Sequence, residues 1–73
     1  MNTYIVPIAD FKAFDTWIVK FNAYSLEDCE NRLMEYLCEL DERLPCNIHY
    51  TDFLEECDKK DICIGEITDI EEL

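Results

Sequence analysis

The chain has 73 residues, 49% of them hydrophobic, and its 18 acidic and 6 basic side chains give a formal net charge of −12. This length leaves room for one hydrophobic core and excludes a second domain, while the apolar content is too high for a disordered chain. We therefore expect a single acidic domain over residues 1–73. Its charge repels phosphate backbones and anionic lipid headgroups, which argues against direct binding to nucleic acid or to a membrane surface.

The location of the protein is expected to be cytoplasmic. No apolar run approaches the ~20 residues needed to cross a bilayer. Residues 1–8 lack the basic region and apolar stretch of a secretory signal. The five cysteines, at positions 29, 38, 46, 57 and 63, are odd in number and form no C-x-x-C pair. We therefore expect reduced thiols, most of them buried as small hydrophobic side chains.

The negative charge is unevenly distributed along the chain. Residues 1–24 contain two acidic and two basic side chains and sum to zero, so residues 25–73 carry the whole −12. Such a field attracts basic partners at a distance, with a strong dependence on salt.

Two strands are predicted at the N-terminus. The stretch 3–8 is rich in β-forming residues, and Pro7 predicts that this strand lies at a sheet edge, because proline cannot donate a ladder hydrogen bond. Residues 16–24 alternate regularly, with Trp17, Val19 and Phe21 on one face. The short segment between the two stretches predicts a hairpin.

A helix is predicted from Leu26 to Leu44. Ser25 and Asp28 have the spacing of a capping box, and Pro45 ends the helix. Apolar residues recur with helical spacing at Leu26, Cys29, Leu33, Leu37, Leu40 and Leu44.

The remaining elements are shorter. We expect a strand at 46–50, a second helix from Asp52 to Lys60, a strand at 62–67 and an acidic tail, 68–73, that frays. The predicted fold class is therefore α+β. It has a small sheet of three to four strands that begins with the hairpin, one long amphipathic helix packed on one face and a second short helix.

Four basic residues follow an acidic residue by four positions within the predicted helices. The pairs are Asp28 with Arg32, Glu39 with Arg43, Glu55 with Lys59 and Glu56 with Lys60. This spacing favours helical ion pairs, so these cations need no functional explanation.

Catalytic and metal-binding motifs are scarce. His49 is the single histidine, and a dyad would need Cys46, Cys57 or Cys63 as its nucleophile. The same four residues offer zinc ligands, but C-x2-H-x7-C-x5-C matches no common zinc module. We therefore expect no metal, no cofactor and no enzymatic activity.

The acidic surface is the candidate binding site. Its carboxylates are Glu27, Asp28, Glu30, Glu35, Glu39, Asp41 and Glu42 on the first helix, and Glu55 and Glu56 on the second. The first seven span roughly 22 Å of helix, a charge density close to that of one DNA strand, which suggests nucleic-acid mimicry. A solvated surface without a partner is the alternative interpretation.

Aromatic residues add a second candidate contact. Phe11 and Phe14 are possible anchors for a partner, since aromatic side chains dominate interface energies. Burial of Trp17 in the core, with at least one phenylalanine covering it, is the alternative.

The leading hypothesis is a small acidic regulator or inhibitor that binds a basic, nucleic-acid-binding surface of a partner protein. Acidic proteins that phages and mobile elements direct against host nucleases share this composition, which is an analogy of class. The alternative is a structural or assembly subunit that homodimerises through an apolar aromatic surface. A metal- or thiol-dependent enzyme is the third reading, and the oligomeric state, monomer or homodimer, stays open.

Overall fold

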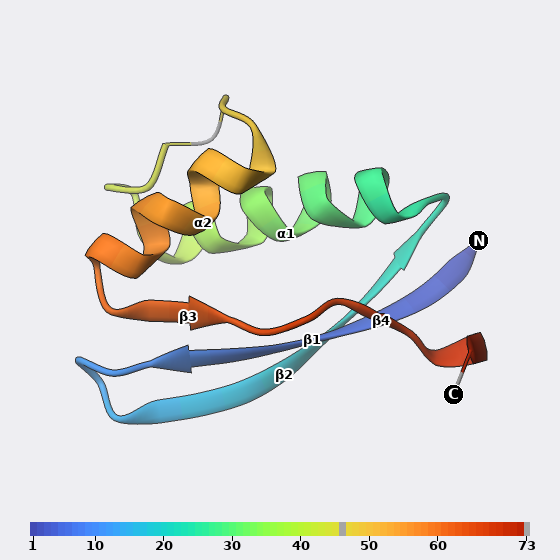
Figure 1. Ribbon diagram of the computed structural model, residues 1–73, viewed down its shortest axis with the longest axis horizontal. Coiled ribbons are helices and arrows are strands. Elements are labelled where there is room, and N and C mark those ends of the chain that lie inside the picture. The colour runs from blue at the N-terminus through green and yellow to red at the C-terminus, as the bar shows by residue number, and fades with distance from the viewer. Residues whose placement is uncertain (46, 73) are drawn as a thin grey trace.

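The computed structural model describes residues 1–45 and 47–72. Its elements are β1 (Asn2–Asp10), β2 (Asp15–Ala23), α1 (Leu26–Leu40), α2 (Tyr50–Lys59), β3 (Ile62–Ile64), β4 (Thr68–Asp69) and a 3-10 turn (Ile70–Glu72). Both helices lie on the same side of the sheet (Figure 1). The predicted α+β class, with a small antiparallel sheet and two helices, is therefore confirmed.

The sheet is organised around β1. This strand pairs with β2 along its whole length, from Asn2 opposite Ala23 to Asp10 opposite Asp15. On its other side β1 pairs with β3 and, farther along, with β4. All pairs are antiparallel, so the predicted N-terminal hairpin is confirmed and supplies the two longest strands.

The prediction that Pro7 marks an edge strand is wrong, because β1 is the middle strand. The amide of Gly65 donates to the carbonyl oxygen of Pro7 at 2.9 Å, so the main-chain polar groups of Pro7 face the β3 side. On that side β3 ends at Ile64 and β4 begins at Thr68. Pro7 has no amide hydrogen to donate, and the side of β1 on which that donor would lie faces the break in the neighbouring strand. No ladder hydrogen bond is required there.

The single strand predicted for 62–67 is divided by this break into β3 and β4, and Ile67 lies between them. The expected frayed tail is also corrected, since Thr68 and Asp69 pair with Ile5 and Tyr4 of β1. The last predicted tail residue, Leu73, lies outside the described residues.

Helix α1 begins as predicted and ends earlier. The hydroxyl of Ser25 accepts from the amide of Asp28 at 3.1 Å, and the carboxylate of Asp28 accepts from the amide of Tyr24 at 3.0 Å. The helix has 15 residues and ends at Leu40, because Asp41 adopts an extended conformation at φ −138°. The expectation of a long helix to Leu44 is therefore wrong. Leu44 is nevertheless buried, as its place in the apolar periodicity predicted, because the turn after the helix carries it into the core.

The strand predicted at 46–50 is also wrong for the residues that can be described. Asn47 and Ile48 form bends, and Tyr50 already begins α2 after His49 at the N-cap. Cys46 lies outside the described residues. The helix begins two residues before the predicted start, and its buried residues are Phe53 and Cys57.

The core lies between the helices and one face of the sheet. Alternate β1 residues Tyr4, Val6 and Ile8 are buried, as strand geometry requires. The helices complete this core with Cys29, Leu33, Met34, Leu37, Phe53 and Cys57.

We expect Gly65→Ala to destabilise the fold. A Cβ at this position would lie 2.5 Å from Cγ of Pro7, too close for a rigid ring to yield. Overpacking of this kind costs about 1–3 kcal/mol, measurable as a lower midpoint of urea unfolding.

The double variant Pro7→Ala, Gly65→Ala is the control, because it removes the ring carbons that obstruct the new methyl group. Most of the loss should be recovered relative to Pro7→Ala alone. An equal loss in both backgrounds would mean that the contact with Pro7 is not its cause.

Candidate functional site

One face of the sheet carries no acidic side chain along its paired strands. Register and strand alternation place ten residues on the face turned away from the helices. This outer sheet face consists of Thr3, Ile5, Pro7, Ala9, Thr16, Ile18, Lys20, Asn22, Cys63 and Thr68. Lys20 is the one charged member of the set.

The opposite side of the molecule is strongly acidic. Residues 26–60, which we call the acidic helical layer, contain eleven acidic and four basic side chains and carry a net −7. Both helices belong to this layer and lie on one side of the sheet (Figure 1). The N-terminal hairpin is neutral over 1–24, and residues 61–73, which include β3 and β4, carry the remaining −5.

Five of the nine predicted site carboxylates are exposed in this layer and belong to none of the ion pairs among the described residues. They are Glu27, Glu35, Glu39, Glu42 and Glu55. Asp52 and Asp58, which are not among the predicted site residues, are also exposed on α2 beside Glu55. Their spacing of three residues, opposite buried Phe53 and Cys57, was the signal that could have identified them.

Three other predicted site residues are held in ion pairs. Asp28 pairs with Arg32 at 3.1 Å, as predicted. The two remaining ion pairs of the described chain, Asp41 with Arg43 at 2.9 Å and Glu56 with Lys59 at 3.1 Å, replace those expected from four-residue spacing.

The predicted pair of Glu39 with Arg43 fails because the helix ends at Leu40 and does not carry Arg43 onto the same face. Lys59 contacts Glu56 instead of Glu55. The ion pair of Glu56 with Lys60 was likewise wrong, since Lys60 is the C-cap of α2 and lies beyond its last helical residue.

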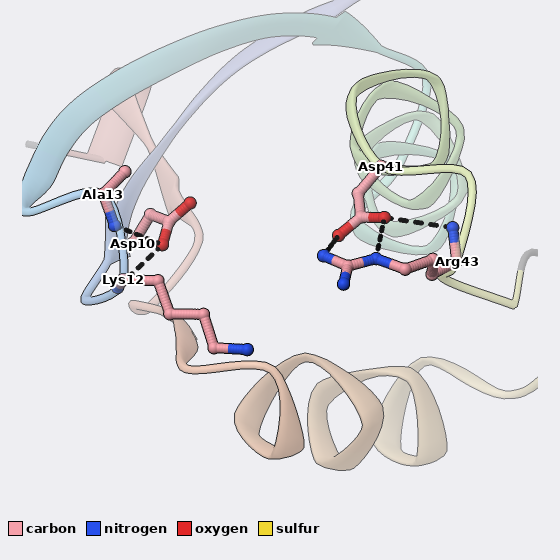
Figure 2. Close-up of polar contacts among 5 residues, drawn as sticks. All are labelled: Asp10, Lys12, Ala13, Asp41 and Arg43. Atoms are coloured by element: carbon pink, nitrogen blue, oxygen red, sulfur yellow. Dashed lines mark hydrogen bonds and ion pairs between the residues drawn. The ribbon is translucent and has the colours of Figure 1, made fainter.

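Asp41 is engaged by its neighbour from several directions. Its carboxylate accepts from Nε and Nη2 of Arg43 and from the Arg43 amide, at 2.9 to 3.0 Å (Figure 2). These hydrogen bonds lower the pKa of Asp41 to about 2. Asp41 is therefore ionised near neutral pH, and its charge is largely matched by Arg43.

Asp10 faces Asp41 across a hollow of about 390 Å³ whose lining includes Trp17. The Asp10 carboxylate accepts from the amides of Lys12 and Ala13 at 3.0 and 3.2 Å and so closes the hairpin turn (Figure 2). Both carboxylates thus have local structural partners. They do not form a carboxylate pair suited to acid–base chemistry.

Glu30 is half-buried between the helices and does not belong to the exposed surface. It lines a hollow with Tyr50 and Leu54 of α2. Desolvation raises the pKa of Glu30, and the nearby charge of Glu27 raises it further. Burial, together with Glu30, also raises the pKa of Tyr50 to about 12.

The predicted match to phosphate spacing is weaker in the folded protein. On α1 the exposed carboxylates without ion pairs are Glu27, Glu35 and Glu39, which extend over about 18 Å of helix. One DNA strand would present roughly five phosphates in that length. The exposed carboxylates of α1 without ion pairs are therefore sparser than a row of phosphates.

The candidate thiol and metal residues do not converge in the described part of the chain. Burial raises the pKa of the Cys57 thiol to about 11, so this group is protonated at neutral pH and is no activated nucleophile. His49 is exposed at the α2 N-cap, and no group of three metal-ligating side chains occurs among the described residues. Cys29, Cys57 and Cys63 are free, whereas Cys38 is disulfide-bonded, contrary to the expectation of reduced thiols.

The two predicted aromatic anchors are exposed at the hairpin turn. Phe11 is 61% and Phe14 95% exposed, so neither is buried over Trp17. Trp17 instead donates from Nε1 to the hydroxyl of Tyr36 on α1 at 3.1 Å. Phe14 has a left-handed backbone with φ 53°, a strained conformation for a bulky residue.

No protein-family model, curated protein sequence or solved structure matches this chain. Within the described residues, neither helix has the length and apolar character needed to cross a membrane.

Glu30→Gln should stabilise the protein at neutral pH. An acid whose pKa is raised by folding destabilises the native state when it ionises, and this cost disappears as pH falls through its pKa. The advantage of the variant should therefore shrink as pH is lowered towards and below the ordinary value of 4.5. Urea unfolding at a series of pH values measures it.

Glu39→Gln is the matched control, since it removes one charge from an exposed position of the same helix. If both variants stabilise the protein equally at every pH, the general negative charge is responsible and desolvation of Glu30 is not.

Phe14→Gly should also stabilise the protein, because glycine adopts positive φ without steric cost. Relief of the left-handed strain outweighs the extra chain entropy of glycine by roughly 0.5–1 kcal/mol. Phe11→Gly is the control, as Phe11 is not among the positive-φ residues. A loss of stability in Phe14→Gly, measured by urea unfolding, would contradict the expectation.

Proposed function

We propose that this protein is a small acidic regulator or inhibitor, without enzymatic activity, that uses its acidic helical layer to bind a basic surface of a cytoplasmic partner protein. The observation that carries the proposal is the net −7 of residues 26–60, where several exposed carboxylates belong to no ion pair of the described residues. The basic surface is that of a nucleic-acid-binding protein, where lysine and arginine gather naturally.

The state of the carboxylates supports this binding mode. Glu35 and Glu39 on α1 and Asp52, Glu55 and Asp58 on α2 are exposed and belong to no ion pair of the described chain. Charges that are not neutralised internally are available to a partner, and they orient it during approach. Both helices are anchored by buried residues, so the carboxylates are presented on a firm surface.

The inhibitory action follows from competition. A partner groove occupied by this layer cannot at the same time hold its nucleic acid, since both ligands are anionic and use the same cations. A phage or mobile-element protein directed against a host nuclease is the finer form of this proposal and rests on composition alone. The spacing of the carboxylates gives it no added support.

The test is displacement of a fluorescent DNA duplex from a basic helix-turn-helix domain, followed by anisotropy. We expect the wild-type protein to compete at about 50 mM salt and to lose at least tenfold in apparent affinity at about 200 mM. Competition that does not change with salt, or no competition by a panel of such domains at low salt, would refute the proposal.

The variant Glu35→Gln, Glu39→Gln, Glu55→Gln tests the location of the site and should weaken competition several-fold. The variant Asp15→Asn, Asp61→Asn, Glu71→Gln is its matched control, since it removes equal charge at exposed positions outside the layer. Equal loss in both variants would show that net charge acts without a defined surface.

A further inference from the structure

The outer sheet face is turned away from α1 and α2, and five of its ten residues are apolar: Ile5, Pro7, Ala9, Ile18 and Cys63. In the half of this face next to the hairpin turn, an open hollow of about 640 Å³ is lined by Pro7, Ala9, Thr16, Ile18 and Cys63 among others. Ile18 is 69% exposed, and Pro7 and Cys63 are exposed as well. A sheet of this kind normally has one face in the core and a polar second face, so exposed apolar residues on the second face indicate an interaction surface.

We propose that a second copy of the same chain covers this face and forms a symmetric dimer with the two sheets packed against each other. The argument comes from charge. Contact through the helical layers would bring −7 onto −7, whereas each outer sheet face contributes the single positive charge of Lys20 and no carboxylate. In a chain of net −12, contact through this face therefore brings two copies together with less repulsion than contact through the acidic helical layer.

The geometry of the sheet also fits a second copy. Two identical twisted sheets pack face to face at an angle of about 30° and a distance of about 10 Å. Ile18 lies at the hollow, so the hollow of each copy can receive Ile18 of the other in an isologous contact. The acidic helical layers then lie on opposite outer sides of the dimer and remain accessible.

The expected affinity follows from the size of the face. Strands β1 and β2, with nine residues each, are about 30 Å long, and three strands are about 15 Å wide. Two copies would bury somewhat less than the ~1,000 Å² that is the lower limit for a stable specific interface. The dimer is therefore weak, with a dissociation constant of micromolar order or above.

Salt separates this contact from docking on a basic partner. Raising the ionic strength screens the repulsion between two copies of charge −12, so dimerisation strengthens, whereas binding to a basic surface weakens. The dimer does not depend on the proposed function, and each can fail without the other.

Sedimentation equilibrium of the full chain tests the proposal, from about 10 µM to 1 mM protein and at about 50 and 500 mM salt. We expect a monomer–dimer equilibrium with several-fold tighter association at the higher salt. Denaturing electrophoresis without reductant confirms that the association is non-covalent. A monomer at every concentration and salt would overturn the proposal.

Variants locate the contact. Ile18→Glu and Cys63→Glu alter opposite sides of the outer sheet face, on β2 and β3, and each should reduce association at least tenfold. Leu40→Glu is the matched control: Leu40 is 61% exposed on α1, and its replacement should leave association within about twofold. Circular dichroism shows whether each variant is folded, and Ile18→Thr, which retains a β-branched side chain, replaces Ile18→Glu if needed.

Each pattern of results decides the matter. Weaker association of Ile18→Glu and of Cys63→Glu, with unchanged association of Leu40→Glu, supports the sheet-to-sheet dimer. Weaker association in only one of the two face variants would indicate pairing through one sheet edge, that of β2 for Ile18→Glu or that of β3 for Cys63→Glu, and would overturn the proposal. Equally weakened association in all three variants, or unchanged association in all three, would also overturn it.

Discussion

The middle position of β1 is the constraint on which the rest of the structure depends. Its side chains alternate, so Tyr4, Val6 and Ile8 enter the core while Ile5 and Pro7 face away from it. Both helices must pack on the first face to bury those residues, which share one core with the buried residues of α1 and α2, and Figure 1 shows both helices on one side of the sheet. The acidic residues of the helices are consequently confined to one side of the molecule, and neither α1 nor α2 covers the other face of the sheet.

Features that depend on near neighbours in the chain could be predicted from the sequence. The hairpin follows from alternation in β2, and the start of α1 follows from Ser25 and Asp28, whose hydrogen bonds join residues three and four positions apart. The position of β1 could not be predicted, because the break that makes Pro7 acceptable in a middle strand is formed by Gly65 and the residues after it. No rule about the proline alone reports where a distant strand is interrupted.

The end of α1 could not be predicted for a different reason, and this error also changed which residues lie on the helical surface of the candidate site. Leu44 is buried whether a helix or a turn carries it inward, so hydrophobic periodicity does not distinguish the two. Asp41 determines the outcome through its hydrogen bonds with Arg43, which removes both residues from the helical surface. Five of the nine carboxylates predicted for the acidic surface are exposed and outside the ion pairs of the described residues, whereas the half-burial of Glu30 depends on the nearby Tyr50 of α2.

The two proposed surfaces have a joint consequence. Because the sheet lies between them, a basic partner on the acidic helical layer and a second copy on the outer sheet face do not compete for space. In the dimer the two acidic layers face outward in opposite directions, so one basic groove cannot contact both. The dimer would therefore not gain avidity on a single groove, since linked sites strengthen binding only when both can be engaged together. It would instead bring two basic partners together, one on each acidic helical layer. One structure would then account for both hypotheses for this chain, the acidic binding protein and the assembly subunit.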